Sequence, residues 1–351
     1  MKGNEALAEA AIRAGCKCFF GYPITPQTEV AAYLAKKLPK TGGQFVQAES
    51  EVAAINMVYG ASAAGVRCMT SSSSPGISLK TEGISYLCGA DLPCVIINVQ
   101  RGGPGLGGIQ PSQADYFQAT RALGHGDSRV IVYAPNSVQE MVNVVNNAFN
   151  LADEYRMPAM ILADGLLGQM MEPVEFPETE TAEVKKPWAT NGHGGSREHN
   201  IVNSLYLKPD VLEKSILERD KRYKDIEAKH TTAESFLCDD AELVIVAYGA
   251  TARVCKSAVN ASRAKGIKAG LFRPVTLWPY PKKELVAASS NAKTLLTVEM
   301  STGQMIEDVK LAIECKKPVE FYGRTGGIIP TPAEVLAQIE KITKTLDMEG
   351  V

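Results

Sequence analysis

The feature that most constrains the fold is an alternation of short β-rich runs with amphipathic helical stretches over the first 164 residues. Runs of β-branched, aromatic and other apolar side chains predict strands, and stretches with a 3.6-residue apolar period predict helices. The expected strands are residues 18–22, 45–47, 66–70, 94–99, 130–133 and 159–163, and the expected helices are residues 4–14, 27–38, 51–63, 77–88, 112–123 and 138–154. Strand–helix–strand units bring parallel strands together. This part therefore predicts an α/β domain with a largely parallel sheet.

The alternation stops near residue 165 and resumes near residue 240. In between, prolines and a glycine-rich run at 191–196 indicate an irregular connection, and residues 208–229 combine dense charge with apolar side chains at helical spacing. Because these charges are mixed in sign, we interpret the stretch as a solvated amphipathic helix between domains. The later strands are expected at 243–248, 268–272, 294–299 and 319–322, and the later helices at 252–265, 282–290, 304–314 and 333–342. We expect a domain at 1–165, a connector with the charged helix at 166–238, and a smaller α/β domain of about four strands at 239–351.

Composition excludes several classes of protein. A length of 351 residues suits two domains of about 150 residues each plus a connector. The 37 basic and 39 acidic side chains leave a net charge of -2, which argues against nucleic acid or an anionic membrane as the main partner. No apolar run approaches the roughly 20 residues that span a bilayer, and the first residues lack a signal-peptide core. We therefore expect a cytoplasmic protein that binds neither nucleic acid nor membrane.

The eight cysteines are scattered and do not form the paired groups typical of zinc or iron–sulfur sites. Cys16 and Cys18 are the only close pair, and no second pair or nearby histidine accompanies them. In a reducing compartment such cysteines are mainly small buried apolar residues. We expect no metal site on this chain, so any electron carrier would lie on another polypeptide.

A glycine-rich segment at residues 103–108 fits the pattern G-x-G-x-x-G directly after the expected strand 94–99. A dinucleotide site would place a ribose-binding acid at the end of the next strand, but residues 130–133 end without one. Pro111 also delays the helix that should follow the glycines. We interpret the segment as a glycine-rich loop, with Arg101 at its base placed to meet an anion.

The segment from Tyr22 to Pro26 closes the first expected strand. Two prolines restrict its backbone, so the Thr25 hydroxyl would be presented at the carboxyl end of the sheet, where ligands of open α/β folds bind. In the alternative interpretation, Thr25 only caps the next helix and Pro26 is its first residue. Taken alone, this segment favours the second interpretation.

Glu51 begins an alanine-rich helix that Ser50 can cap. A glutamate in a first turn ordinarily stabilises the helix dipole. The following turns are small and apolar, however, so the helix start could be shielded from water, and a shielded carboxyl group could act as an acid or base. Glu49 is the competing candidate, and its position before the helix favours exposure to solvent.

Four serines, a proline and a glycine at residues 71–76 follow one expected strand and precede a helix. The start of a helix binds anions well, but the segment lacks the G-K-[ST] ending of a phosphate-binding P-loop. We expect its backbone amides and hydroxyls to line a pocket.

Together these segments resemble the α subunit of the 2-oxoacid:ferredoxin oxidoreductases. The resemblance extends from the first helix to the C-terminus and is carried by residues 22–26, 51–61, 74–76, 99–104, 273–279, 298–304 and 326–330. Residues 110–115 of the glycine-rich loop are most similar to the branched-chain, 2-oxoisovalerate type. The resemblance implies an N-terminal thiamine-diphosphate pyrimidine-binding domain and a smaller transketolase C-terminal-like α/β domain.

The resemblance also implies roles for individual residues. The family's catalytic glutamate bonds N1′ of the cofactor's pyrimidine, and the matching residue is Glu51. Thr25 and Arg101 match the positions that hold the substrate carboxylate, a role suited to a hydroxyl and a guanidinium group. The other expected cofactor contacts are Tyr22, Pro23, Ile24, Ser74 and Gly76.

Finally, the resemblance implies oxidative decarboxylation of a 2-oxoacid to acyl-coenzyme A and CO2, with reduction of ferredoxin. The motif that holds Mg²⁺ and the diphosphate is expected on a β subunit, because the nearest string here, at residues 163–165, lacks its first glycine. Iron–sulfur clusters are expected on a further subunit. Two alternatives remain: the same fold acting on 2-oxoglutarate, pyruvate or indolepyruvate, and a non-catalytic assembly or nucleotide-binding protein.

Overall fold

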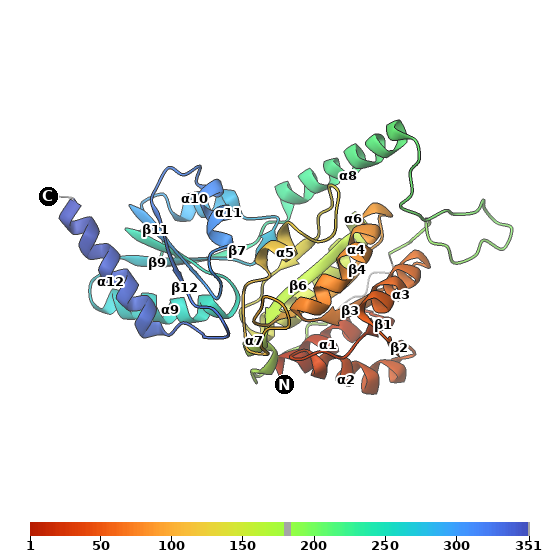
Figure 1. Cartoon of the computed structure of the whole chain (residues 1–351), viewed down its shortest axis with the longest axis horizontal. Helices are drawn as coiled ribbons and strands as arrows, with labels where there is room; N and C mark the ends of the chain where they lie inside the picture. Colours follow the sequence, from red (N-terminus) through yellow and green to blue (C-terminus); the bar gives the residue numbers. More distant parts are fainter. Residues whose placement is uncertain (179–183, 350–351) are drawn as a thin grey trace.

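The computed structural model describes residues 1–178 and 184–349, which form two α/β units lying side by side (Figure 1). The strands of the first unit are β1 (Cys18–Gly21), β2 (Gln44–Gln47), β3 (Cys68–Ser72), β4 (Cys94–Gln100), β5 (Ile131–Tyr133) and β6 (Pro158–Asp164). Its helices are α1 (Gly3–Arg13), α2 (Thr28–Lys37), the 3-10 helix η1 (Leu38–Thr41), α3 (Glu51–Ala63), α4 (Ser74–Gly89), α5 (Tyr116–Thr120), α6 (Val138–Tyr155), α7 (Gly165–Gln169) and α8 (Pro209–Lys229). The later strands are β7 (Ala233–Phe236), β8 (Leu243–Val246), β9 (Ala269–Pro274), β10 (Thr276–Trp278), β11 (Thr294–Glu299) and β12 (Val319–Gly323). The later helices are α9 (Gly249–Ala264), α10 (Lys282–Ala288), α11 (Met305–Ala312) and α12 (Pro332–Glu349).

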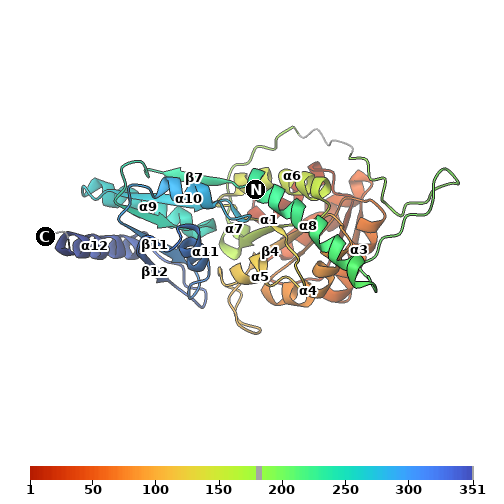
Figure 2. The same ribbon diagram turned by 90° about the horizontal axis from the view of Figure 1, so that it is seen from above.

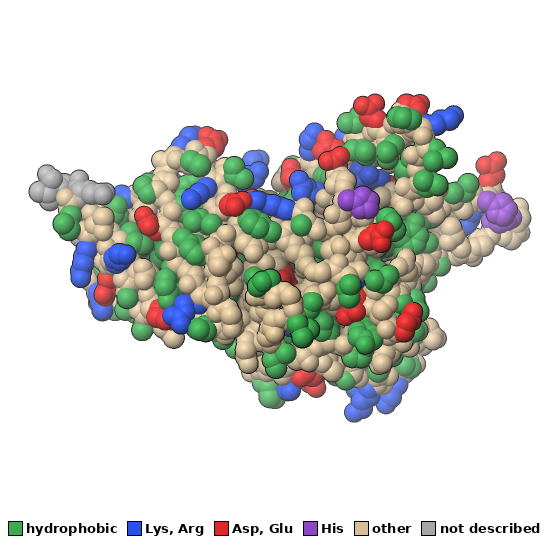
Figure 3. Space-filling view, viewed as in Figure 1, with side chains coloured by type: hydrophobic (Ala, Val, Ile, Leu, Met, Phe, Trp, Pro, Cys, Tyr) green, Lys and Arg blue, Asp and Glu red, His purple; other side chains and the backbone are tan. Residues whose placement is uncertain are grey.

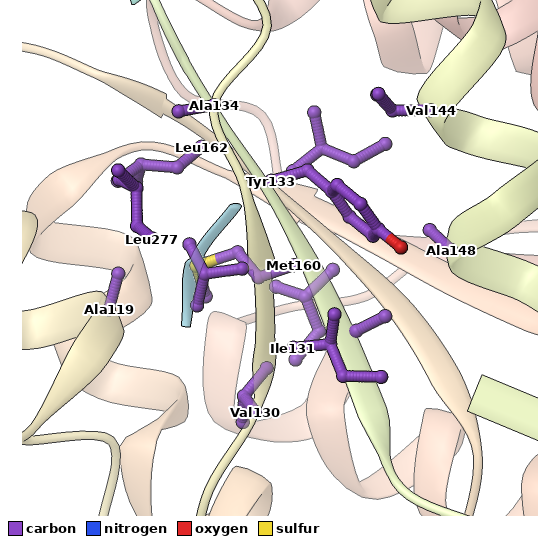
Figure 4. Packing of buried hydrophobic residues seen from close by; sticks show 14 of the residues in the cluster. Ala119, Val130, Ile131, Tyr133, Ala134, Val144, Ala148, Met160, Leu162 and Leu277 are labelled. Atoms are coloured by element: carbon purple, nitrogen blue, oxygen red, sulfur yellow. The ribbon is translucent and has the colours of Figure 1, made fainter. Parts of the chain in front are cut away.

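The first sheet has seven strands in the order β10-β5-β6-β4-β3-β1-β2, and all its pairs except β10–β5 are parallel. Helices α1 and α6 pack on one face and α3 and α4 on the other. Every residue of β4 and β6 is buried, as expected for strands covered on both faces. Figure 4 shows Tyr133 of β5 directed toward Val144 and Ala148 of α6, whereas Met160 and Leu162 of β6 lie on the opposite side, with Leu277 of β10. The α/β class expected from the sequence is confirmed.

The parallel strands β4, β3, β1 and β2 are neighbours, so their carboxyl ends meet at one edge of the sheet. These ends are Gln100, Ser72, Gly21 and Gln47. The segments that the sequence singled out lie at these ends or directly after them, although Ser71 and Ser72, which were expected to follow a strand, are the last residues of β3. This edge therefore positions the candidate site.

The second sheet has five strands in the order β12-β11-β8-β9-β7, one more than expected. The extra strand is β7, which pairs antiparallel with β9. Alternate residues of β8 belong to two different cores: Leu243 and Ile245 pack with α9 and α12, whereas Val244 and Val246 join the core shared with the first unit. The two units are thus joined by packed apolar side chains.

Strand β10 was not expected, and it belongs to the first sheet although it follows the second unit's β9 in the chain. Thr276 and Trp278 pair antiparallel with β5. The strand is only three residues long and lies between Pro274 and Pro279, so its sequence resembles a loop. Its pairing is decided by contacts far away in the chain.

The charged helix α8 occurs where the sequence predicted it, but it is not merely solvated. Arg219, Tyr223 and Ile226 are buried, and Figure 2 shows the helix lying along the first unit. Arg219 and Arg222 both contact Asp91 at the end of α4. The apolar residues at helical spacing therefore mark a packed face.

The helix expected at residues 112–123 is reduced to α5, because Gln113 is held by the second unit. Its backbone amide donates to the Met300 carbonyl at 2.9 Å, and its side-chain amide donates to the Tyr248 carbonyl at 2.8 Å. Its side-chain oxygen accepts from the Thr251 hydroxyl at 2.7 Å. These tertiary hydrogen bonds replace those that a longer helix would make within itself.

On the face shown in Figure 3, basic and acidic side chains are interspersed, in keeping with the near-neutral composition. Within residues 1–178 and 184–349, no helix is both long and apolar enough to cross a bilayer.

Candidate functional site

Glu51 lies at the start of α3, and the Ser50 hydroxyl caps the helix by accepting from the Ala53 amide at 3.1 Å. The glutamate is only 7% exposed, whereas Glu49 is exposed, as the sequence predicted. Among the described residues, no hydrogen bond or ion pair reaches the Glu51 carboxylate. A buried carboxylate that the chain itself leaves without a partner is a candidate for binding a ligand.

Gly76 and Ser72 lie directly against this carboxylate. A Cβ atom placed on Gly76 would come within 2.7 Å of Oε1 of Glu51 and closer still to Oγ of Ser72. The hydroxyls of Ser72 and Ser73 are buried and have no hydrogen-bond partner among the described residues. The end of β3 thus brings the unused Ser72 hydroxyl to Glu51, and the start of α4 brings a position without a side chain.

The Ser74 hydroxyl, in contrast, is already hydrogen-bonded, and it joins the start of α4 to the segments that contain Arg101 and Asp115. It donates to Oδ2 of Asp115 at 2.6 Å, and it accepts from the Arg101 backbone amide at 3.0 Å. Asn98 donates to the same Asp115 oxygen at 2.9 Å. Burial raises the pKa of Asp115, which these two donors partly offset. The sequence had not assigned Asn98 or Asp115 a role, although Asp115 lies in the loop that carries the family resemblance.

Arg101 and Thr25 are brought together, as the sequence predicted. The Arg101 guanidinium is 7% exposed and donates to the carbonyl of Thr25 at 2.9 Å and to that of Leu106 at 3.1 Å. Its Nε is buried and has no partner among the described residues. One N–H of this fork therefore remains available for an anionic ligand.

Thr25 is exposed and does not cap a helix, so the alternative interpretation of this segment is wrong. Helix α2 begins at Thr28, with Gln27 at its cap position. Gln27 is fully buried and accepts from the Ser71 hydroxyl at 2.5 Å. This bond joins the segment after β1 to the end of β3, and sequence reasoning missed it because a glutamine beside a helix start carries no distinctive signal.

The remaining expected cofactor contacts, Tyr22, Pro23 and Ile24, lie at the rim of this edge. Tyr22 is 39% exposed, and its carbonyl accepts from the Gln27 side chain at 3.4 Å. The structure brings Glu51 and Gly76 together, and it joins Thr25 and Ser74 through Arg101.

The glycine-rich loop after Arg101 contacts the second unit. A Cβ atom on Gly327 would collide with the Gln110 side chain. The backbone of the segment around Gly327 in the second unit therefore packs against a side chain of this loop. Leu106 and Ile109 of the loop are 82% and 56% exposed. The loop thus exposes apolar side chains close in the chain to Arg101, whose guanidinium bonds the Leu106 carbonyl.

Asp164 is used as a helix cap. Its Oδ1 accepts from the amides of Leu166 and Leu167 at 2.9 and 3.1 Å, which starts α7. Burial raises the pKa of Asp164 to about 6, despite these bonds. This use of the carboxylate agrees with our rejection of residues 163–165 as a diphosphate motif.

Comparison with known proteins identifies the family. A sequence profile described as pyruvate flavodoxin/ferredoxin oxidoreductase, thiamine diphosphate-binding, matches residues 9–234, well over half of the chain. The chain belongs to this family. The profile of pyruvate:ferredoxin oxidoreductase core domain II matches residues 241–335.

Individual members of the family and of its fold support this assignment. The chain is 50% identical to ketoisovalerate oxidoreductase subunit VorB of Methanothermobacter marburgensis, over 97% of both chains. A 2-oxoglutarate:ferredoxin oxidoreductase from Magnetococcus marinus, solved with 2-oxoglutarate, coenzyme A and succinyl-CoA bound, has a TM-score of 0.83 and 28% identity, covering 97% of this chain and 64% of that one. A split-gene transketolase, with a TM-score of 0.62 and 16% identity over 97% of both chains, shares the fold. The expected resemblance to the branched-chain type of oxidoreductase is confirmed.

Proposed function

We propose that this chain is the pyrimidine-binding α subunit of a thiamine-diphosphate-dependent oxidoreductase. The complex would convert a branched-chain 2-oxoacid and coenzyme A to acyl-coenzyme A and CO2, passing two electrons to ferredoxin. The observation that carries the proposal is the buried Glu51 carboxylate, which has no hydrogen bond from the described residues and lies beside the unpartnered hydroxyl of Ser72.

The residues around Glu51 fit an aminopyrimidine ring. Glu51 would hold the ring nitrogen N1′ and move a proton at that atom, and its burial excludes competing water. The free hydroxyls of Ser72 and Ser73 would be satisfied by polar atoms of the ring. When bound, the cofactor supplies the nucleophilic carbon and the electron-accepting ring that decarboxylation of a 2-oxoacid requires.

Arg101 and Thr25 would hold the carboxylate of the substrate. The guanidinium is already oriented by two backbone carbonyls and keeps one buried N–H unused. Replacing Arg101 with Leu should raise KM for the 2-oxoacid about tenfold or more, since a charged hydrogen bond is lost. An unchanged KM in the assembled complex would contradict the contact, and Arg101→Lys tests whether charge alone is sufficient.

A branched-chain substrate is favoured by the relative named ketoisovalerate oxidoreductase, which is 50% identical. Steady-state rates with a viologen acceptor, measured for 2-oxoisovalerate, 2-oxoglutarate, pyruvate and indolepyruvate, test this choice. We expect the highest kcat/KM for 2-oxoisovalerate, and a higher value for another acid would reassign the substrate.

The chain would act with partner subunits. A β subunit would hold Mg²⁺ and the diphosphate, and a cluster-bearing subunit would pass electrons to ferredoxin. Exposed apolar side chains on α3 and α4 favour this face as the contact with the β subunit: Val52, Met57, Leu79 and Tyr86 are 45%, 36%, 55% and 37% exposed. Residues 1–165 would form the pyrimidine-binding domain, 166–238 the connector and 239–351 the smaller domain.

The deciding experiment is purification of the native complex followed by analysis of thiamine, iron and sulfide. We expect all three in the complex and no stoichiometric thiamine on the isolated chain. An isolated chain that retained the cofactor and oxidised 2-oxoacids unaided would refute the shared site. Tight binding of NAD or ATP in calorimetric titration would instead favour a nucleotide-binding protein.

A further inference from the structure

Lys80 lies in the interior of the first unit and takes no part in the site as described so far. It is fully buried and is among the largest buried side chains of the protein. Gly76, Lys80 and Gly83 lie on one face of α4, because residues three and four apart share a helix face. A Cβ atom on Gly83 would come within 2.8 Å of Ile55 on α3, as one on Gly76 would of Glu51. The two glycines hold α3 and α4 close together, with Lys80 between them.

The ammonium group of Lys80 is directed at the first turn of α3. Its Nζ donates to the backbone carbonyl of Glu51 at 3.3 Å, which is its one hydrogen bond among the described residues. Burial of a charged group is costly unless another charge compensates it. Burial lowers the pKa of Lys80 to about 8, and the negative charge of Glu51 acts in the opposite direction.

Other titratable groups contact α4 at different positions. Asp115 bonds Ser74 at the start of the helix, and the His125 ring contacts Ser85 about three turns further on. Glu82 bonds Tyr86 on the exposed face of α4. Glu51, from α3, is therefore the charged group that faces Lys80.

Given the proposed function, we propose that Lys80 is a positioning residue for the cofactor site. It holds the first turn of α3 through the Glu51 carbonyl and compensates the charge of the Glu51 carboxylate while this binds the pyrimidine ring. A lysine at this position contacts neither substrate nor cofactor, and it acts only through Glu51.

The proposal predicts a specific dependence of cofactor binding on pH. Below pH 8 the ammonium is charged, and the site is intact. As pH rises through about 8, Lys80 loses its proton, and the affinity for thiamine diphosphate should fall because the charge that faces Glu51 disappears. For the same reason, binding at pH 8 should draw a proton from the solution.

The test uses the assembled complex, stripped of cofactor, and isothermal titration with thiamine diphosphate and Mg²⁺ between pH 6.5 and 9. Wild type is compared with Lys80→Met, which keeps the length but not the charge, with Lys80→Arg, which keeps the charge, and with the exposed Lys36→Met as control. We expect Lys80→Met to bind thiamine diphosphate about tenfold more weakly than wild type at pH 7. Its affinity should also no longer fall as pH rises through about 8. Lys80→Arg should restore affinity and show no step below pH 9, since a guanidinium stays charged.

A wild-type pH step that persists in Lys80→Met would overturn the proposal, as would unchanged affinity of that variant at pH 7. Should neither variant assemble, titration of wild type at pH 8 in buffers of different ionisation enthalpy decides, and binding without proton uptake would refute the role. A wild-type complex that fails to bind thiamine diphosphate would instead refute the proposed function itself. The two failures are therefore distinguishable.

Discussion

The two units each bury a glutamate beside the start of a helix, and the two carboxylates are treated in opposite ways. In the second unit, Glu299 is fully buried at the end of β11 and accepts from the Ser301 hydroxyl and from the backbone amides of Gln304, Met305 and Ile306. In the first unit, the Glu51 carboxylate accepts no hydrogen bond from residues 1–178 or 184–349.

This difference separates a structural acid from one available to a ligand. Burial raises the pKa of Glu299, but its four donors satisfy the carboxylate and begin α11. Around Glu51, the nearby Ser72 hydroxyl is likewise without a partner. Burial alone therefore does not indicate a functional acid, whereas burial without internal hydrogen bonds does.

The largest effect should come from Glu51→Gln. In the assembled complex this change should reduce 2-oxoacid-dependent viologen reduction by about 10²-fold or more, because a positioned acid is lost. Thermal stability should change little, since the chain makes no hydrogen bond to the carboxylate. Glu49→Gln is the matched control on the exposed side, and near-normal turnover of Glu51→Gln would remove Glu51 from the mechanism.

Glu299→Ala should destabilise the protein rather than impair the chemistry at Glu51. Loss of the carboxylate leaves the first amides of α11 without an acceptor, which should cost about 2–4 kcal/mol in the free energy of unfolding. Denaturant unfolding measures this cost. Glu307→Ala, which removes only a surface ion pair with Arg121, should cost less than about 1 kcal/mol. Equal effects of the two variants would contradict the contrast.

Asp164, like Glu299, is a buried carboxyl group that caps a helix, so it should contribute to stability and not to the chemistry at Glu51. Folding raises its pKa from 3.8 to about 6, so the folded protein binds the proton more tightly than the unfolded chain. The contribution of this group to stability is therefore greatest below pH 4 and falls as pH rises to about 6, by about 1–3 kcal/mol. Asp164→Asn should remove that part of the stability–pH curve, and an unaltered curve would argue against the shift.

Two glycines give the smallest and most local test. Gly76→Ala places a methyl group on Glu51 and Ser72 and should weaken thiamine diphosphate binding about tenfold, the scale of overpacking a filled site. Gly60→Ala on α3 adds its methyl where no atom lies within 4 Å. It should raise the free energy of unfolding by about 0.5–1 kcal/mol. Equal cofactor affinity of the two variants would show that the space at Gly76 is unimportant.

Local sequence predicted the elements that form the site. Helix α3 occurs at the predicted residues 51–63 because Ser50 caps it and no glycine or proline interrupts its first turns. The strand ends were predicted from apolar runs, and parallel pairing placed them on one edge. Glu51 and Arg101 could thus be located before any contact was known.

Long-range contacts decided what the sequence could not show. Gln113 bonds residues more than 130 positions away, and these bonds shortened the expected helix to α5. Lys80 is one lysine among many in the sequence, and only the packing of α3 against α4 reveals that it is buried. Helix α7 could have been found, since Asp164 followed by Gly165 is a capping signal.

Because β10 pairs with β5, the first sheet is complete only after part of the last third of the chain has been synthesised. While the ribosome has released only the residues before β10, β5 has an open edge that can pair with β5 of another nascent chain. Cutting the protein before residue 239 would leave the same edge bare, so the amino-terminal part should aggregate when produced alone. Evolutionary exchange of the carboxyl-terminal unit would have to carry a fitting replacement for these three residues.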